Sequence, residues 1–303
     1  MLPFDPKETA IALRNGDFQS LARVLTWVEN ELPGSSELLC ALHSDPGVAV
    51  VGFTGPPGAG KSTLINSLIT HWTALGKKVA ILAVDPTSPF NFGSLLGDRL
   101  RMAEHFNNPN VFIRSVATRG SLGGLSEKVI ELTDVLRCAA FDIIIVETVG
   151  VGQSEIEIAG LADTTVVMVV PEAGDEIQTM KSGIMEIADL FIVNKADREG
   201  ADSLLFALQQ LVVHPKSDGW KIPVLKTTAT LQSGVAEVAA AIEKHRTSGA
   251  FNEKKIYLLT EKAYRLIQQQ RMRGVLKSEL LEELKKVVNT ENFNLYRFVS
   301  TRG

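Results

Sequence analysis

The strongest chemical pattern in the sequence lies at residues 55–62, which read GPPGAGKS. This run satisfies G-x-x-x-x-G-K-[ST] at every fixed position and stands between an apolar run and a helical pattern. Glycines let the backbone turn its N–H groups toward phosphate oxygens, and the helix that follows adds the positive end of its dipole. The lysine supplies a charge between the β- and γ-phosphates, and the serine hydroxyl ligates Mg²⁺. We therefore predict a nucleotide-binding phosphate loop, rather than an empty glycine-rich turn, formed by Gly55, Pro56, Pro57, Gly58, Ala59, Gly60, Lys61, Ser62 and Thr63.

A second motif indicates which base the nucleotide carries. The run NKAD at 194–197 follows the apolar stretch 190–193. A carboxylate at Asp197 can accept hydrogen bonds from guanine N1–H and the 2-amino group, whereas adenine would leave it unpaired. Asn194 would brace the loop and reach the base, and the stem of Lys195 would lie along the ring. The motif predicts GTP and GDP as ligands, with Mg²⁺ as the metal cofactor.

A further candidate for the base lies after the apolar stretch 223–225. Thr227, Thr228 and Ala229 could close over the edge of the base there. A threonine-rich turn with a purely structural role explains these residues equally well.

Acidic residues after apolar runs are candidates for holding magnesium and the attacking water. Asp85 follows the run 79–84, at the strand end where ligands bind in open α/β sheets; an aspartate that starts a turn before proline is the alternative. For Asp98 the alternative is a solvated helix start. Glu147 ends the run 143–146, and a glycine three residues later could sense the γ-phosphate. The predicted metal ligands are Ser62, Asp85, Asp98 and Glu147, and the predicted catalytic groups include Lys61, Asp85, Glu147 and Gly150.

The residue after Gly150 bears on the rate of hydrolysis. Val151 stands where small signalling GTPases carry a water-orienting glutamine, and Gln153 is shifted by two positions. We therefore predict slow intrinsic hydrolysis that a partner accelerates.

The elements around these motifs alternate between apolar strands and amphipathic helices. Seven short runs are apolar without alternation, as expected for strands covered on both faces: 48–54, 79–84, 111–116, 143–146, 165–170, 190–193 and 223–225. Helical patterns between them imply right-handed crossovers. The predicted fold class is α/β, a doubly wound, mostly parallel sheet of the P-loop NTPase type with helical arms. The predicted domains are an N-terminal arm at 1–45, the nucleotide-binding domain at 46–248 and a C-terminal arm at 249–303.

Composition narrows the functional classes. The formal net charge is -4, and we find no dense Lys/Arg run that would indicate a nucleic-acid surface. Two distant cysteines, Cys40 and Cys138, form neither a metal-binding pattern nor a disulfide framework, which indicates a reducing compartment. No apolar stretch is long enough to cross a bilayer, and the first residues do not read as a secretory signal. We expect a cytoplasmic protein that binds neither membrane nor nucleic acid.

Long blocks of the sequence resemble the MeaB/ArgK family of GTPases, which includes the human methylmalonic aciduria type A protein. The resemblance covers residues 15–248, and its blocks are GPPGAGKST, VDPTSPFNFGSLLGDRLRM, ATRGSLGGLS, ETVGVGQSE and PEAGDEIQTMKSGIMEIADLFIVNKAD. It implies a homodimeric GTPase chaperone of an adenosylcobalamin-dependent acyl-CoA mutase, methylmalonyl-CoA or isobutyryl-CoA mutase. Such proteins gate cofactor delivery from an adenosyltransferase and protect the mutase.

The same resemblance assigns switch regions. It places Asp85 and Asp98 in a first switch and residues 147–150 at the start of a second. A third switch covers residues 173–185, where Lys181 would couple the nucleotide state to the partner; a surface lysine is the alternative. Other functions to be weighed are a metal-delivery GTPase, an ATP-dependent kinase linked to amino-acid transport and a non-catalytic nucleotide-binding scaffold.

Overall fold

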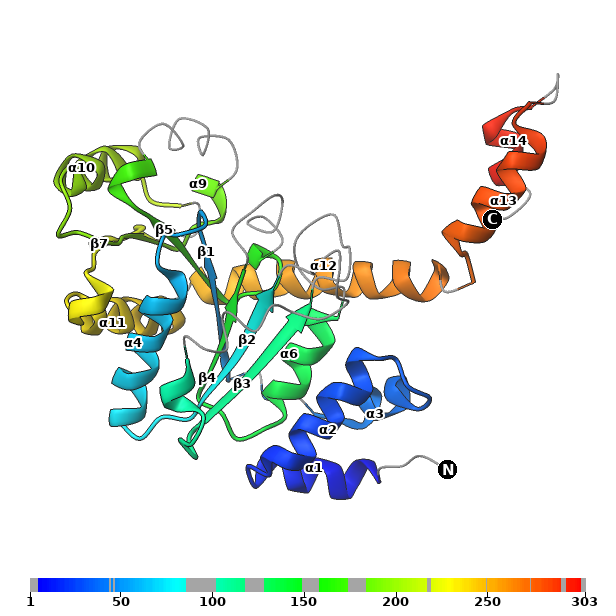
Figure 1. The fold of residues 1–303 in the computed structure, drawn as a ribbon, viewed down its shortest axis with the longest axis horizontal. Helices are drawn as coiled ribbons and strands as arrows, with labels where there is room; N and C mark the ends of the chain where they lie inside the picture. Colours follow the sequence, from blue (N-terminus) through cyan, green and yellow to red (C-terminus); the bar gives the residue numbers. More distant parts are fainter. Residues whose placement is uncertain are drawn as a thin grey trace. The chain divides into compact units, whose positions relative to one another are not determined.

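The computed structural model describes residues 5–43, 45, 47–85, 102–117, 128–148, 158–173, 184–216, 219–248, 250–272, 274–289 and 293–300. Its centre is a seven-stranded sheet in the order β3-β2-β4-β1-β5-β6-β7, in which every described pair is parallel (Figure 1). The predicted doubly wound sheet is confirmed, and each strand ends within one residue of its expected bounds. The strands are β1 Ala49–Thr54, β2 Val79–Asp85, β3 Val111–Ala117, β4 Ile143–Glu147, β5 Thr164–Val169, β6 Leu190–Val193 and β7 Val224–Lys226.

The strands are apolar throughout because both faces of the sheet are covered. Val50 and Val51 are adjacent in β1, yet they point into different cores. Helices α4 and α11 cover one face, and α6 and α10 lie over parts of the other (Figure 1). The described helices of this part, including three short 3₁₀ helices, are α4 Lys61–Ala74, η1 Ala103–His105, α6 Val129–Arg137, η2 Pro171–Ala173, α9 Ile184–Ile187, α10 Ala201–Leu211, η4 Ala229–Leu231 and α11 Val235–Arg246.

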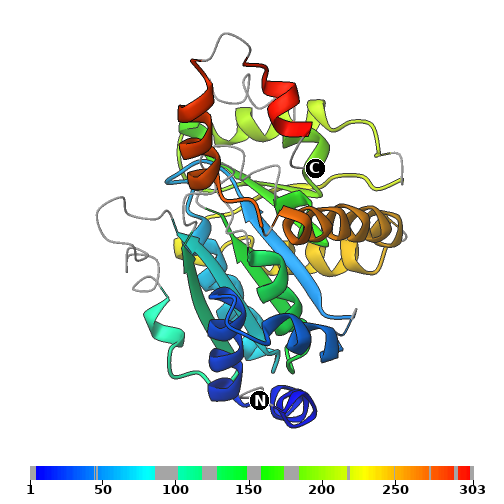
Figure 2. The same cartoon turned by 90° about the vertical axis from the view of Figure 1, so that its right-hand side faces the viewer.

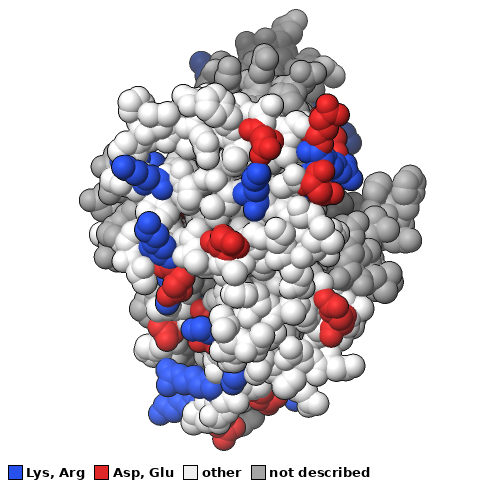
Figure 3. Space-filling model, turned by 90° about the vertical axis from the view of Figure 1, so that its left-hand side faces the viewer, with Lys and Arg blue, Asp and Glu red and all other residues white. Residues whose placement is uncertain are grey.

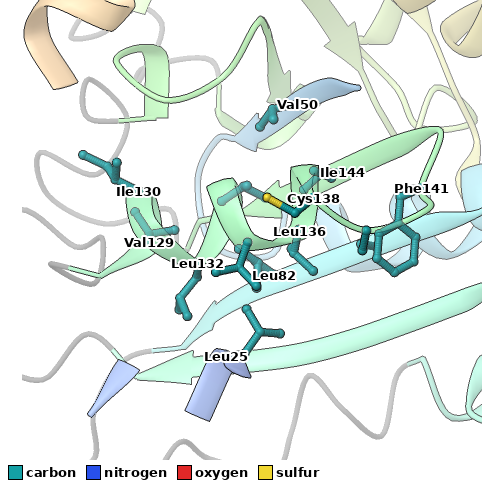
Figure 4. Packing of buried hydrophobic residues seen from close by; sticks show 14 of the residues in the cluster. Leu25, Val50, Leu82, Val129, Ile130, Leu132, Leu136, Cys138, Phe141 and Ile144 are labelled. Atoms are coloured by element: carbon teal, nitrogen blue, oxygen red, sulfur yellow. The ribbon is translucent and has the colours of Figure 1, made fainter. Parts of the chain in front are cut away.

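The N-terminal helices share a hydrophobic core with the sheet. These are α1 (Pro6–Arg14), α2 (Phe18–Glu29) and α3 (Ser35–Ala41), and α2 packs against α6 (Figures 1 and 2). Leu25 of α2 lies in the same cluster as Leu82 and Ile144 of the strands, and Figure 4 labels all three. An ion pair of 2.5 Å between Glu29 and Arg114 of β3 also joins α2 to the sheet. The first helices are therefore packed as a layer of the sheet domain.

By its contacts the chain divides into two compact units, Met1–Leu258 and Leu259–Gly303. Helix α12 (Ala250–Met272) crosses this boundary, and α13 (Lys277–Val287) and α14 (Leu295–Ser300) belong to the second unit. The domain limits at residues 46 and 249 stay predictions. Among the described helices, none combines the length and the apolar character that a membrane span requires.

The surface carries charges of both signs. On the face shown in Figure 3, Lys and Arg side chains are interspersed with Asp and Glu, and several touch. Lys226 and Asp202, with 2.7 Å between Nζ and Oδ1, form one such exposed ion pair. Each such pair contributes at most about 1 kcal/mol to stability.

Candidate nucleotide-binding site

The predicted site residues meet at one edge of the sheet because all strands run in the same direction. The phosphate loop follows β1, Glu147 ends β4, and residues 194 and 227 follow β6 and β7. Strand β1 lies between β4 and β5. The connection after β1 runs to β2 on one side of β1, and the connection after β4 runs to β5 on its other side, so the strand order reverses at β1. A crevice outside the carboxyl ends of the strands at such a switch point is where doubly wound sheets bind ligands.

The phosphate loop has a conformation that its glycines permit. Gly55, Gly58 and Gly60 have φ values of 138°, 77° and 86°, in the region that side chains disfavour. A Cβ on Gly55 would lie 2.2 Å from the carbonyl oxygen of Met168 in β5. One on Gly60 would lie 2.4 Å from Nδ2 of Asn194, so the loop and the base motif are in close contact. Helix α4 begins directly after this loop at Lys61.

The side chains of Lys61 and Ser62 are buried and already hydrogen-bonded within the protein. Lys61 Nζ donates to the carbonyl oxygens of Gly55 and Pro56 at 2.8 and 3.1 Å. Ser62 Oγ donates to Oε1 of Glu147 at 2.7 Å, which brings the hydroxyl and carboxylate together across 85 residues. These are hard oxygen donors beside a phosphate loop, the chemistry that Mg²⁺ prefers. Ser62 and Glu147 therefore fit the predicted magnesium site.

Asn194 joins the phosphate loop to the base motif. The side chain is 2% exposed, and its Nδ2 donates to the carbonyl of Ala59 at 2.8 Å. Its Oδ1 accepts from Thr227 Oγ1 at 2.9 Å and from the Ala229 N–H at 3.3 Å. In the same motif Lys195 has a φ of 54°, and Asp197 is exposed. The motif is therefore anchored through Asn194, while its carboxylate faces solvent.

The turn after β7 is held at the same edge. Thr228 and Ala229 are buried, and Thr228 forms an isolated antiparallel bridge with Ser233 that closes the turn. Gly234 has a φ of 79°, and a Cβ there would lie 2.2 Å from the carbonyl oxygen of Lys226. The structure thus brings the turn into contact with Asn194, as a contact with the edge of the base requires.

Several predicted residues lie outside what the structure describes. Asp98, Gly150 and Lys181 fall there, as does most of the predicted third switch at 173–185. Asp85 is described by its backbone, which is the last residue of β2 and pairs with Ala117 of β3. The roles of these four residues stay predictions.

Sequence analysis did not predict a role for Ser67 at this edge. Its hydroxyl, on α4, donates to the carbonyl of Ala229 at 2.9 Å. Thr227 was expected only in the turn near the base, and the structure adds that its hydroxyl donates to Asn194 Oδ1. Ser67 lies within the buried face of α4, next to Leu68. A polar residue at an apolar helical position was the one available signal, and it does not name the partner.

A phosphate loop and an N-K-x-D motif at the switch point of a parallel sheet define the class of P-loop GTPases. The family model described as methylmalonyl Co-A mutase-associated GTPase MeaB matches residues 21–286. The chain belongs to this MeaB family, and the resemblance found in the sequence is confirmed.

Individual relatives agree with this assignment. A putative GTPase of Pyrococcus abyssi is 47% identical over 253 residues, which are 80% of this chain and 78% of that protein. The methylmalonic aciduria type A homolog of Caenorhabditis elegans, named as mitochondrial, is 35% identical over 76% of this chain and 63% of its own length. A crystal structure titled LAO/AO transport system kinase superposes with a TM-score of 0.71 at 26% identity, covering 98% of this chain and 95% of that one. The predicted GTPase activity is confirmed at the level of the family.

Proposed function

We propose that this GTPase binds GTP and GDP with Mg²⁺ at the described edge and acts as a switch and chaperone for an adenosylcobalamin-dependent acyl-CoA mutase. The observation that carries the nucleotide part is the set of hydrogen bonds from Asn194 to Ala59 and Thr227. They hold a phosphate cradle and a base motif at a fixed separation, as one bound nucleotide needs. The family description supports the mutase part, because it names methylmalonyl-CoA mutase.

The phosphate end of the site has a clear division of roles. Lys61 neutralises the β- and γ-phosphates, exchanging its bonds to loop carbonyls for bonds to phosphate oxygens. Ser62 and Glu147 hold the metal, with Asp85 and Asp98 completing its shell or positioning water. Magnesium, when bound, neutralises charge on the phosphates. In the proposal Gly150 senses the γ-phosphate and Lys181 passes the nucleotide state to the partner.

The base end is tested by changing one atom of Asp197. Asp197→Asn replaces an acceptor by a donor, which suits the 2-oxo group of xanthine and not the 2-amino group of guanine. We expect GDP affinity to fall by about 100-fold or more and xanthosine diphosphate affinity to rise, measured by calorimetry with Mg²⁺. Asp202→Asn, at an exposed acid of α10 paired with Lys226, is the control and should bind GDP normally. Unchanged GDP binding by Asp197→Asn would refute the base assignment.

The rate of hydrolysis tests the role of a partner. Without a glutamine after Gly150, the purified protein should turn over GTP more slowly than about once per second, the low end of ordinary enzymes. Adding the partner mutase should raise that rate. A fast rate for the protein alone would contradict the expectation of partner stimulation.

The client is identified by recovery from the native cells. The tagged protein is loaded with GDP or with a non-hydrolysable GTP analogue, and captured proteins are identified by mass spectrometry. We expect methylmalonyl-CoA or isobutyryl-CoA mutase in a nucleotide-dependent amount, with an adenosyltransferase as a second partner. Recovery of a nickel enzyme instead would favour metal delivery. Because both cysteines are free, we place this assembly in a reducing compartment, the cytoplasm.

The proposal includes a homodimer. The second unit exposes apolar side chains, including Ile267, Leu276 and Leu281. Such exposure is typical of a surface that a partner covers. Light scattering of the purified protein should give twice the chain mass of 32.9 kDa, and a monomeric mass would overturn this part.

A further inference from the structure

Ser67 makes an unusual hydrogen bond for a serine inside a helix. Such a hydroxyl usually donates to the carbonyl four residues earlier, here Thr63, and that oxygen is 3.2 Å away. The carbonyl of Ala229 is closer, at 2.9 Å, and belongs to the turn after β7. Ser67 is 5% exposed, so water does not compete freely for this bond. The hydroxyl therefore ties the helix of the phosphate loop to the turn at the base end.

This bond completes a closed series of hydrogen bonds through the site, which we call a circuit. From Ser67 the circuit passes to the Ala229 carbonyl, from the Ala229 N–H to Asn194 Oδ1, and from Asn194 Nδ2 to the carbonyl of Ala59. Ala59 lies two residues before the start of α4, which carries Ser67. The backbone thus completes a ring that contains the phosphate loop, the base motif and the turn. Each of the three elements is held by the other two.

The Ala229 N–H is the donor in this ring that a base could use. Its nitrogen lies 3.3 Å from Asn194 Oδ1, beyond the usual range for an N–H···O bond, so the N–H can be shared with another acceptor. Guanine presents its 6-oxo group beside the N1–H that Asp197 would accept. The Ala229 methyl group is buried in the core to which α4 and α11 contribute, and the Ala229 carbonyl is bonded to Ser67, so the backbone at this residue is held in place.

We propose that Ser67 is a positioning residue for guanine recognition: by holding the Ala229 carbonyl, it aims the 228–229 backbone at the 6-oxo group of the base. Ser67 itself touches no ligand in this arrangement. The inference rests on the proposed guanine-nucleotide site and adds a residue that sets its selectivity. It separates two parts of base recognition, the 2-amino group read by Asp197 and the 6-oxo group read by the turn.

Diphosphates with altered bases separate the two parts by experiment. Inosine diphosphate lacks the 2-amino group, and 6-thioguanosine diphosphate replaces the 6-oxo oxygen by a larger and weaker acceptor. We expect Ser67→Ala to weaken GDP binding by about two- to tenfold, as for loss of one hydrogen bond. Its preference for GDP over the 6-thio compound should fall by the same factor. Its preference for GDP over inosine diphosphate should stay within about twofold of wild type.

Helix α4 offers a matched control. Thr70 is part-buried three residues further on, and its hydroxyl donates to the carbonyl of Asn66 in the same helix at 3.1 Å. Thr70→Ala removes a hydroxyl whose hydrogen bond stays within α4, so both preferences should equal those of wild type. Ser67→Thr keeps the hydroxyl and should restore the preference over the 6-thio compound. Calorimetry with Mg²⁺ gives all the constants.

Two outcomes would overturn the role of Ser67. One is wild-type binding of GDP by Ser67→Ala. The other is an equal loss of affinity for all three diphosphates, which indicates a general weakening of the fold. The proposed site fails in a different way, because wild type would then not bind GDP or Asp197→Asn would bind it normally.

Discussion

The contact between Gly60 and Asn194 predicts that two glycines of the phosphate loop respond differently to the same substitution. Gly58 and Gly60 have similar φ values, 77° and 86°. A Cβ on Gly58 meets nothing within 4 Å, whereas one on Gly60 lies 2.4 Å from Asn194 Nδ2. Gly58→Ala therefore introduces backbone strain alone, about 1–2 kcal/mol. Gly60→Ala introduces the same strain and must displace a buried side chain.

The additional cost follows from what Asn194 would lose. Its side chain makes hydrogen bonds to Ala59, Thr227 and Ala229, and the net value of a buried neutral bond is about 1 kcal/mol. Displacement that breaks one to three of them costs about 1–3 kcal/mol beyond the strain. For a unit of this size, 1 kcal/mol lowers Tm by about 2–4 °C. Gly60→Ala should therefore melt about 2–12 °C below Gly58→Ala.

Urea and thermal unfolding of the nucleotide-free protein measure this difference without interference from a ligand. A double substitution identifies its cause. In the Asn194→Ala background the space at residue 194 is vacated, so Gly60→Ala should cost no more there than Gly58→Ala does. Equal destabilisation by the two glycine substitutions, or an unchanged cost of Gly60→Ala in that background, would refute the reasoning.

Three more predictions concern the core. Burial, with a smaller effect of the Asp134 charge, raises the pKa of the Cys138 thiol to about 11, so about 0.1% of it is thiolate at pH 8. Iodoacetamide should therefore label the exposed Cys40 but not Cys138 until the protein unfolds or the pH nears 11, and peptide mass spectrometry would show the difference. Arg137→Met leaves the buried Asp163 without its 2.6 Å ion pair and should cost about 3–5 kcal/mol in urea unfolding, with much of the loss recovered by Asp163→Asn; a cost below that of an exposed pair would count against it. Gly52→Ala places a Cβ 2.4 Å from Cγ1 of Ile158 and 2.8 Å from Cβ of Ala162 and should cost about 1–3 kcal/mol; Ile158→Ala should relieve part of that cost, and if it relieves none, the contact with Ile158 is not its cause.

The sheet could be predicted because its signal is local. Each strand carries consecutive apolar residues, as in Ile144 and Ile145 of β4, which enter different cores. That pattern has one common explanation, a strand covered on both faces, and the helices between the strands then require parallel order. The motif residues follow these strands directly. Their meeting at one edge of the sheet is therefore a consequence of topology that the sequence contains.

The packing of the N-terminal helices could not be predicted in the same way. The stripe at Phe18, Leu21 and Leu25 shows that one face of α2 is buried, but periodicity does not say against what. In the structure the Phe18 ring lies 5.4 Å from that of Phe112 in β3 and 5.8 Å from that of Phe141 before β4. Such contacts join residues about a hundred positions apart. They depend on shape, which no pattern along the chain encodes.

In the candidate site, too, the contacts between side chains that are distant in sequence could not be predicted. The motifs name Lys61, Ser62 and Asn194, but only the fold shows that Ser62 bonds Glu147 and Asn194 bonds Ala59. Each bond couples elements that follow different strands. The residues with recognisable motifs were therefore predictable. Ser67, which bonds Ala229 across 162 residues from a position in α4 outside the motif, was not.

The hydrogen bonds of Asn194 also bear on how the site reaches its affinity. They join groups of the protein itself, so we expect folding to set the relative position of the phosphate loop and the base motif. In a preorganised site, ordering the protein's own groups subtracts less from the binding free energy. Substitutions that disturb the Asn194 hydrogen bonds, such as Gly60→Ala, should therefore lower stability and nucleotide affinity together. Asp197→Asn, at an exposed carboxylate, should instead alter base selection with little effect on stability. The two effects separate residues that build the site from the residue that reads the base.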